Sequence, residues 1–303
     1  MRFCTAASGR RRRAAAATAV AVAMLGGATA CGSETGSGPD QQLTPAQAVS
    51  RAAETTTGLT SLRYRVAGTV PEHGRIRAEA SMAVDPTVMR MKITGLGDAA
   101  DKPVEIRFVG GALYTQADTK VLGDTSGRHW AKAEPAVWGS GTADNRSYGV
   151  LPRQLEGSPL VQSTILAGAR KVRETGTETV DGTRTTHYAG EVTSKGLRKA
   201  QFAAGDKKTR ELRMNGLDQF LGLGLRSGSE LTVDLWIDGD GRAKRFRLRG
   251  DTRALDAKGR QVDTGPLDLT FTFLDADPSV DVEPPAADDT LDLAELVGGP
   301  PQP

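Results

Sequence analysis

The chain has 303 residues, of which 39 are basic and 37 acidic, so its formal net charge at pH 7 is +2. Five of the basic residues (Arg2 and Arg10 to Arg13) lie among the first thirty, which contain no acid, so the remainder is slightly acidic. This charge, without a basic stripe interleaved with aromatic residues, excludes a nucleic-acid-binding protein. The length allows one large domain or two small ones.

The first thirty residues have the organisation of an export signal. Arg10 to Arg13 form a positive block, residues 14–25 form an apolar run, and Ala28-Thr29-Ala30 supply small side chains. The run is too short to span a bilayer as a mature helix. A buried N-terminal helix is the alternative, but four adjacent arginines would cap it badly. We therefore predict that residues 1–30 are a signal peptide.

Cys31 follows the small residues directly, and the only other cysteine is Cys4 in the predicted signal. Cys31 therefore keeps no disulfide partner after export. The stretch Ala28-Thr29-Ala30-Cys31 resembles a bacterial lipobox, although Ala28 stands where the motif usually has leucine. The resemblance implies cleavage before Cys31 and a diacylglyceryl thioether carrying acyl chains such as palmitate. The alternative is an ordinary signal followed by a free cysteine.

Each buried methylene contributes about 0.8 kcal/mol to membrane binding, so two or three acyl chains make a stable anchor. We expect the chain on the outer face of the cytoplasmic membrane. Residues 31–42 are polar and rich in Gly and Ser, and would form a flexible tether. Residues 43–282 would form the folded domain. Residues 283–303 are rich in proline and predict a tail with at most one docked turn, around Leu291, Leu293 and Leu296.

Helix signals are few. Thr44-Pro45-Ala46-Gln47 is a capping box with proline at the first helical position, and it predicts a helix that ends before Gly58. Ser158-Pro159 opens a second predicted helix, which would continue through LVQSTILAGARKV. Weaker helical patterns lie near residues 196–202 and 217–225. Residues 122–157 are rich in Gly, Ser and Pro and predict long loops.

The dominant period is two. Apolar and charged residues alternate in residues 62–66, 76–84, 89–93 and 104–108, and again in 231–237, 246–248 and 267–273. Such alternation places an apolar and a charged face on each strand. The turn Asp238-Gly239-Asp240-Gly241 suits a tight hairpin. The fold class is therefore α+β, with a long antiparallel sheet and a few helices on its apolar face.

Together with the lipobox and the tether, the stretches VDGTRTTHYAGEV (180–192) and LTVDLWIDGDGRAKRFRL (231–248) resemble the actinobacterial lipoproteins of the LppX/LprG type. These belong to the LolA-like class of lipoprotein and lipid carriers. The resemblance covers most of residues 43–282, and its motifs are structural. It implies a strongly curved half-barrel whose concave apolar face is closed by helices, with a cavity that accepts acyl chains.

No pattern predicts catalysis. His73, His129 and His187 lack metal-ligand spacing, and no serine has glycines two residues before and after it. His187 alternates within a predicted strand and is interpreted as a surface or packing residue. Trp236 shares its face with Asp234 and Asp238, which places it on the outer face or the rim. The DGDG turn lacks the distal glutamate of a calcium loop. We expect a non-enzyme without metal or cofactor.

We therefore predict a membrane-anchored lipoprotein that binds a lipid or another amphiphile in an apolar cavity. The alternative is an anchored module with a filled core that binds an envelope enzyme or sensor. Methionine is flexible and suits a surface that adapts to variable chains. The predicted ligand-binding residues share the apolar face of the strands: Met82, Val84, Met89, Met91, Ile93, Ile106, Phe108, Val233, Leu235, Ile237, Phe246, Leu248, Leu269 and Phe271.

Overall fold

A computed structural model describes residues 43–71, 73–96, 102–116, 125, 127–134, 150–225, 228–255, 258 and 260–293. The predicted signal peptide, the lipidation residue Cys31 and the tether lie outside these residues. Among the described helices, none has the length and apolar character needed to cross a membrane.

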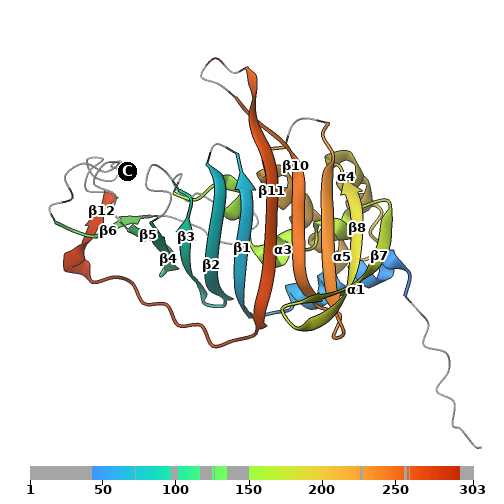
Figure 1. The fold of residues 1–303 in the computed structure, drawn as a ribbon, viewed down its shortest axis with the longest axis horizontal. Coiled ribbons are helices and arrows are strands. Elements are labelled where there is room, and N and C mark those ends of the chain that lie inside the picture. The colour runs from blue at the N-terminus through green and yellow to red at the C-terminus, as the bar shows by residue number, and fades with distance from the viewer. Residues whose placement is uncertain are drawn as a thin grey trace, which may run out of the picture. The chain divides into compact units, whose positions relative to one another are not determined.

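Within the described residues the strands form one open twelve-stranded sheet, in the order β12-β6-β5-β4-β3-β2-β1-β11-β10-β9-β8-β7 (Figure 1). Neighbouring strands are antiparallel except β12 and β6, and pairing of β1 with β11 joins the two halves of the chain. The strands are β1 (Ser61–Val70), β2 (Gly74–Val84), β3 (Thr87–Thr94), β4 (Val104–Val109), β5 (Ala112–Gln116), β6 (Trp130–Ala133), β7 (Val172–Val180), β8 (Thr183–Val192), β9 (Leu231–Asp238), β10 (Ala243–Leu255), β11 (Gln261–Ala276) and β12 (Thr290–Asp292).

The described helices lie on one face of the sheet, behind the strands in Figure 1. We call this the inner face and the opposite one the outer face. Helix α1 packs most closely on β7, β9 and β10, and the 3-10 helix η2 packs on β8 and β9. The helices are α1 (Pro45–Thr57), α3 (Pro159–Gln162), α4 (Ser194–Phe202) and α5 (Lys207–Gly222), with 3-10 turns η1 (Arg153–Leu155), η2 (Ile165–Gly168) and η3 (Ala287–Asp289).

Several local predictions are confirmed. Thr44 and Gln47 form the capping box of α1: the backbone N–H of Thr44 donates to Gln47 Oε1 at 2.9 Å, and Thr44 Oγ1 accepts from the N–H of Gln47 at 3.4 Å. The Asp238 carboxylate accepts hydrogen bonds from the backbone N–H groups of Asp240 and Arg242, at 3.0 and 2.9 Å. Gly241 has a φ of 75°, so the DGDG stretch is the hairpin turn between β9 and β10.

The second predicted helix is wrong in length. It stops after α3, is followed by the 3-10 turn η2, and gives way to β7 at Val172. The hydroxyls of Ser163 and Thr164 each donate to the carbonyl three residues before, at 2.7 Å, which competes with continued helix. Gly168 then packs where an added Cβ would strike the Leu197 side chain.

Two predicted loop or tail regions contain strands. Residues 122–157 were expected to be loops, but Trp130–Ala133 form β6 and Arg153–Leu155 form η1. In the predicted tail, the segment after β11 runs along the sheet to β12, which pairs in parallel with β6 (Figure 1). An ion pair of 3.4 Å between Lys132 and Asp292 supports this pairing. The tail therefore holds more structure than the single turn expected.

Candidate functional site

The inner face is a continuous apolar surface. Strand pairing sets Met82 beside Met89 and Met89 beside Phe108, while Met91 pairs with Ile106. The other predicted residues form equivalent rows, and all of the following are buried: Met82, Met89, Met91, Ile93, Ile106, Phe108, Val233, Leu235, Ile237, Phe246, Leu248, Leu269 and Phe271. The structure therefore brings thirteen of the fourteen predicted ligand-binding residues onto one buried face.

Val84 differs from these thirteen residues because it is exposed. It is the last residue of β2 and pairs with Thr87 across the turn that begins β3. Its side chain is 41% exposed because the strand ends there, beyond the covered part of the sheet. Val84 therefore lies at an exposed end of the inner face, and its part in ligand binding stays a prediction.

The two halves of the inner face meet at β1. Val66 lies between Phe271 of β11 and Ala78 of β2, and Tyr64 lies between Phe273 and Ala80. Phe246 stacks on Phe271 with ring centroids 4.5 Å apart. Burial raises the pKa of the Tyr64 phenol far above its usual range, so this hydroxyl stays neutral and the face stays uncharged.

The helical layer contains a buried polar group that the sequence did not reveal. The Gln162 side-chain amide donates to the Gln154 carbonyl oxygen at 3.0 Å, and the Gln154 amide donates to the Leu223 carbonyl oxygen at 3.0 Å. Gln162 Oε1 is buried and has no hydrogen-bond partner among the described residues. Glutamine side chains usually lie at the protein surface. The short segment with Leu and Ile around Gln162 therefore did not predict that this side chain is buried.

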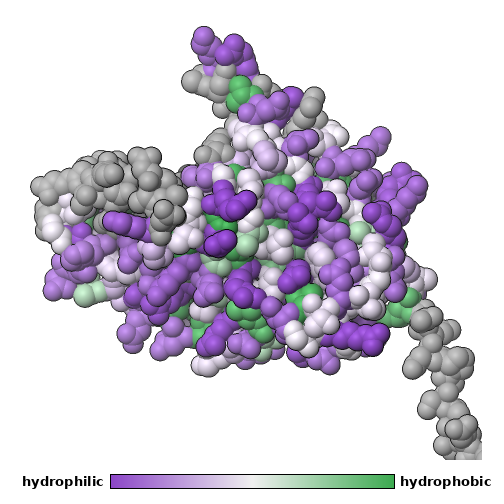
Figure 2. Space-filling view, viewed as in Figure 1, coloured by the Kyte–Doolittle hydropathy of each residue, from purple (hydrophilic) through white to green (hydrophobic). Residues whose placement is uncertain are grey.

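The outer face is largely hydrophilic (Figure 2), and several of its arginines form ion pairs with carboxylates. Arg90 and Arg107 both donate to Glu105, at 2.8 and 2.9 Å, and Arg247 donates to Asp268 at 2.6 Å. Partial burial would raise the pKa of Glu105, but the hydrogen bonds from Arg90 and Arg107 outweigh it and hold that pKa below its usual value. Glu105 is therefore ionised at neutral pH.

An aromatic stack crosses the same face. The His187 ring lies on the Trp236 ring at a centroid distance of 4.2 Å, and the guanidinium of Arg245 lies 5.6 Å from the Trp236 centroid. His187 Nε2 is also 3.0 Å from an Asp234 carboxylate oxygen. His187 is therefore a packing residue, as interpreted from the sequence. Within the part of the chain that the structure describes, no three His, Cys, Asp or Glu side chains are grouped to hold a metal ion.

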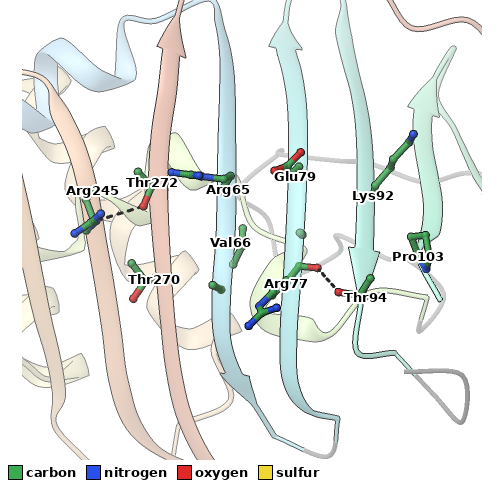
Figure 3. A pocket seen from close by; sticks show the side chains of 12 residues that line it. Arg65, Val66, Arg77, Glu79, Lys92, Thr94, Pro103, Arg245, Thr270 and Thr272 are labelled. Atoms are coloured by element: carbon green, nitrogen blue, oxygen red, sulfur yellow. Dashed lines mark hydrogen bonds between the residues drawn. The ribbon is translucent and has the colours of Figure 1, made fainter. Parts of the chain in front are cut away.

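Two of the hollows lined by described residues have volumes above 500 Å³, and both differ from the predicted apolar cavity. One, of about 570 Å³, lies between the turns at the ends of β3 and β4 and residues 280–282, and includes Val88, Val109 and Val282. Of the predicted ligand-binding residues, only Phe108 lines it. The other, of about 510 Å³, is a groove on the outer face that crosses β10, β11, β1, β2 and β3 (Figure 3).

Comparisons with known proteins found a relative in sequence and several solved structures of similar fold. No protein-family model matches this chain. A protein of Streptomyces griseus, described as an uncharacterized 31.2 kDa protein in the rplA-rplJ intergenic region, is 27% identical over 212 residues, which are 67% of this chain and 62% of that protein. This chain therefore matches less than two thirds of the length of that relative.

Among solved structures, the fold is similar to the lipoprotein LppX of Mycobacterium tuberculosis, with 15% identity, a TM-score of 0.44 and coverage of 79% of this chain and 98% of LppX. LprF of Mycobacterium bovis gives 14% identity, a TM-score of 0.46 and coverage of 80% and 97%. A lipoprotein-sorting protein domain of Vibrio parahaemolyticus is more distant, with 7% identity, a TM-score of 0.19 and coverage of 75% and 89%. Because all three scores lie below 0.5, we base the functional proposal on the residues of this chain.

Proposed function

We propose that this chain is an exported, non-catalytic lipoprotein that is anchored to the membrane through Cys31 and binds the acyl chain of a lipid or another amphiphile on the inner face. The observation that carries the proposal is the continuous apolar surface from β10 to β4, which includes Met82, Met89 and Met91.

An acyl chain on the inner face would be stabilised by its buried area and by side chains that can adjust to its shape. Apolar surface removed from water contributes about 25 cal/mol per Å², so burial of about 200 Å² of acyl chain would contribute about 5 kcal/mol. The three methionines lie on adjacent strands, β2 and β3, and their unbranched side chains can adjust to chains of different shape. The closest helix contacts are made with β7 to β10, away from these methionines.

Entry of a ligand requires movement. Met82, Met89, Met91 and Ile106 are almost fully buried, so an acyl chain must displace whatever covers them before it can touch them. A ligand that binds only the opened state has its apparent affinity reduced by the fraction of molecules in that state. We therefore expect slow lipid uptake that accelerates with temperature or with mild detergent.

The same burial favours a second candidate. A closed inner face with residues at 0–1% exposure is also what a filled core requires, and a partner-binding module would use it only for stability. In that case the anchored domain would recognise an envelope enzyme or sensor through its surface. The two candidates make opposite predictions for lipid content.

Lipid content is tested with the chain purified without its signal peptide. We expect co-purified lipid that is visible by native mass spectrometry, is extracted by organic solvent, and is replaced by a fluorescent fatty acid. Met91→Asp should abolish binding by placing a charge on the face. Since that variant can fail to fold, Met91→Phe tests the site with an apolar but stiffer side chain, and Arg75→Gln on the outer face is the matched control. Lipid-free wild-type protein that also fails to bind the fatty acid would contradict the carrier and favour the second candidate.

The anchor is tested separately. Cys31→Ala removes the thiol to which the acyl chains would attach, and we expect the variant to appear in the medium instead of the membrane fraction. The measurement is the partition of the protein after a carbonate wash. A Cys31→Ala protein that stays membrane-bound would show that lipid at Cys31 is not the anchor.

A further inference from the structure

The shape of the groove on the outer face follows from the side chains that are neighbours across adjacent strands. In one row across the strands, Thr272, Arg65, Glu79 and Lys92 are neighbours, and in the next row Thr270 and Ala67 are neighbours. The small side chains of the second row leave a hollow of about 510 Å³, while the long side chains form its walls (Figure 3). This volume is within the usual range of small-molecule sites.

The groove is electropositive. Its lining includes four cationic side chains, Arg65, Arg77, Lys92 and Arg245, and one carboxylate, Glu79. These side chains come from the strands β1, β2, β3 and β10. Residues 31–303 carry 34 basic and 37 acidic side chains, so the positive charge of the groove is a local feature and does not follow from overall composition.

Much of this positive charge is not neutralised by a close carboxylate. Arg77 makes no ion pair and no side-chain hydrogen bond among the described residues, and Lys92 approaches Glu105 only to 4.0 Å. Arg245 donates through Nε to the Thr272 hydroxyl at 3.3 Å and lies over Trp236, so it is positioned without a carboxylate partner. By contrast, the other outer-face arginines Arg247 and Arg249 are each held by an aspartate at 2.6–2.8 Å.

The arrangement is three-sided. Arg65 and Arg245 lie on the two sides of Thr272, and Arg77 lies below them on β2 (Figure 3). Arg65 is held by Asp181 of the β7–β8 turn at 2.8 Å through one Nη, which leaves its other N–H groups free to donate. A planar carboxylate offers two oxygens in one plane, whereas a phosphate ester offers three acceptor oxygens that can meet donors from several directions.

From this geometry we propose that the outer-face groove binds a phosphate ester, with Arg77 and Arg245 as its main cationic contacts and the Thr270 and Thr272 hydroxyls beside it. The phosphate monoester can be a soluble compound or the headgroup of a lipid such as phosphatidic acid, because both present three terminal oxygens. The site is on the opposite face of the sheet from the proposed acyl-chain surface and does not depend on it.

The test uses the mature chain, residues 31–303, with Cys31→Ser so that no acyl anchor adds affinity. Calorimetry with glycerol 3-phosphate is compared with glycerol, and flotation with phosphatidic acid vesicles is compared with phosphatidylcholine vesicles. Binding of the monoester identifies a soluble ligand, and binding of the anionic vesicles alone identifies a headgroup. Either result supports the proposal if it weakens as salt is raised.

Arg77→Gln is the decisive variant, because Arg77 is exposed and its loss should leave the fold intact. Removal of one charge-assisted contact should weaken binding about ten-fold. Arg75→Gln removes the same charge from the same strand and the same face but does not line the groove, and it should bind like the wild type. Absence of binding to both probes, or equal losses in the two variants, would overturn the proposal, whatever the outcome of the lipid experiment.

Discussion

The two faces of the sheet are built from alternating residues of the same strands, yet they are stabilised in different ways. On β2 the side chains of Ile76, Ala78 and Ala80 are buried on the inner face, whereas Arg77 and Glu79 between them are exposed on the outer face. Inner-face residues gain from removal of apolar area from water, which any well-fitting hydrocarbon can provide.

Outer-face residues depend on particular partners. The Glu105 carboxylate is stabilised on the outer face because two arginines donate hydrogen bonds to it. Arg90 reaches it from the neighbouring strand β3, and Arg107 lies on β4, the strand of Glu105 itself. A solvent-exposed ion pair contributes only about 0–1 kcal/mol. We therefore expect most of the stability of the protein to come from the inner face, and specific recognition of charged groups to occur on the outer face. Substitutions can test each half of that statement.

The largest effect is expected on the inner face. Phe271 is almost fully buried and stacks on Phe246, so Phe271→Ala removes both its buried area and its ring contact. We expect a loss of about 3–5 kcal/mol in the free energy of unfolding, measured by urea denaturation. Arg75→Ala on the outer face should change it by less than about 0.5 kcal/mol. Similar losses for the two variants would contradict the division between the faces.

A smaller loss is expected where the two central strands meet. Gly68 of β1 has a φ of 148°, and an added Cβ would collide with the backbone carbonyl of Asp268 in β11. Gly68→Ala should therefore destabilise the protein by about 1–3 kcal/mol through backbone strain. Gly74→Ala is the matched control, because Gly74 also has a positive φ but has open space around it. Equal losses of melting temperature in the two variants would contradict this prediction, because they would show that the close approach of the Asp268 carbonyl to Gly68 adds no destabilisation.

The smallest loss of stability is expected for the ion-pair cluster of Glu105 with Arg90 and Arg107, and this loss should depend on pH. Glu105→Gln should cost about 1 kcal/mol at pH 7, because both arginine partners remain partly solvated. The folded pKa of Glu105 lies below its ordinary value of 4.5, so its contribution is fully present above that pH and is lost as the pH falls through the folded pKa.

Thermal melts from pH 7 to pH 3 measure this contribution. The wild type should lose its advantage over Glu105→Gln as the pH falls below about 4.5, the unfolded pKa of a glutamate. A difference in melting temperature that stays constant across this range would show that the Glu105 charge does not act through its protonation.

Much of the fold could be predicted from short stretches. The alternation in residues 76–84 and 231–237, the capping box at Thr44 and the turn at Asp238 each correspond to the observed element, because period, cap and turn chemistry act over a few residues. The lipidation residue Cys31 stays a prediction, since it lies outside the described residues.

Other features could not be predicted in this way. The break of the predicted helix after Ser158 into α3 and η2 combines the local hydrogen bonds of the Ser163 and Thr164 hydroxyls with packing against α1, α5 and the sheet, which are distant in sequence. Residues 130–133 form a strand because β5 and β12 supply partners on either side. Their own composition, Trp-Ala-Lys-Ala, does not favour a strand strongly.

Two properties follow from the order of neighbouring residues alone: the chain is rich in strands, and these strands are apolar on one side. Only the tertiary structure decided which strands adjoin, that Val84 lies beyond the covered face, and that Arg65, Arg77 and Arg245 surround one groove. Those three arginines come from β1, β2 and β10, and β1 reaches β10 only through β11. A pairing across about 200 residues depends on the free energy of the whole sheet, and no local stretch of sequence specifies it.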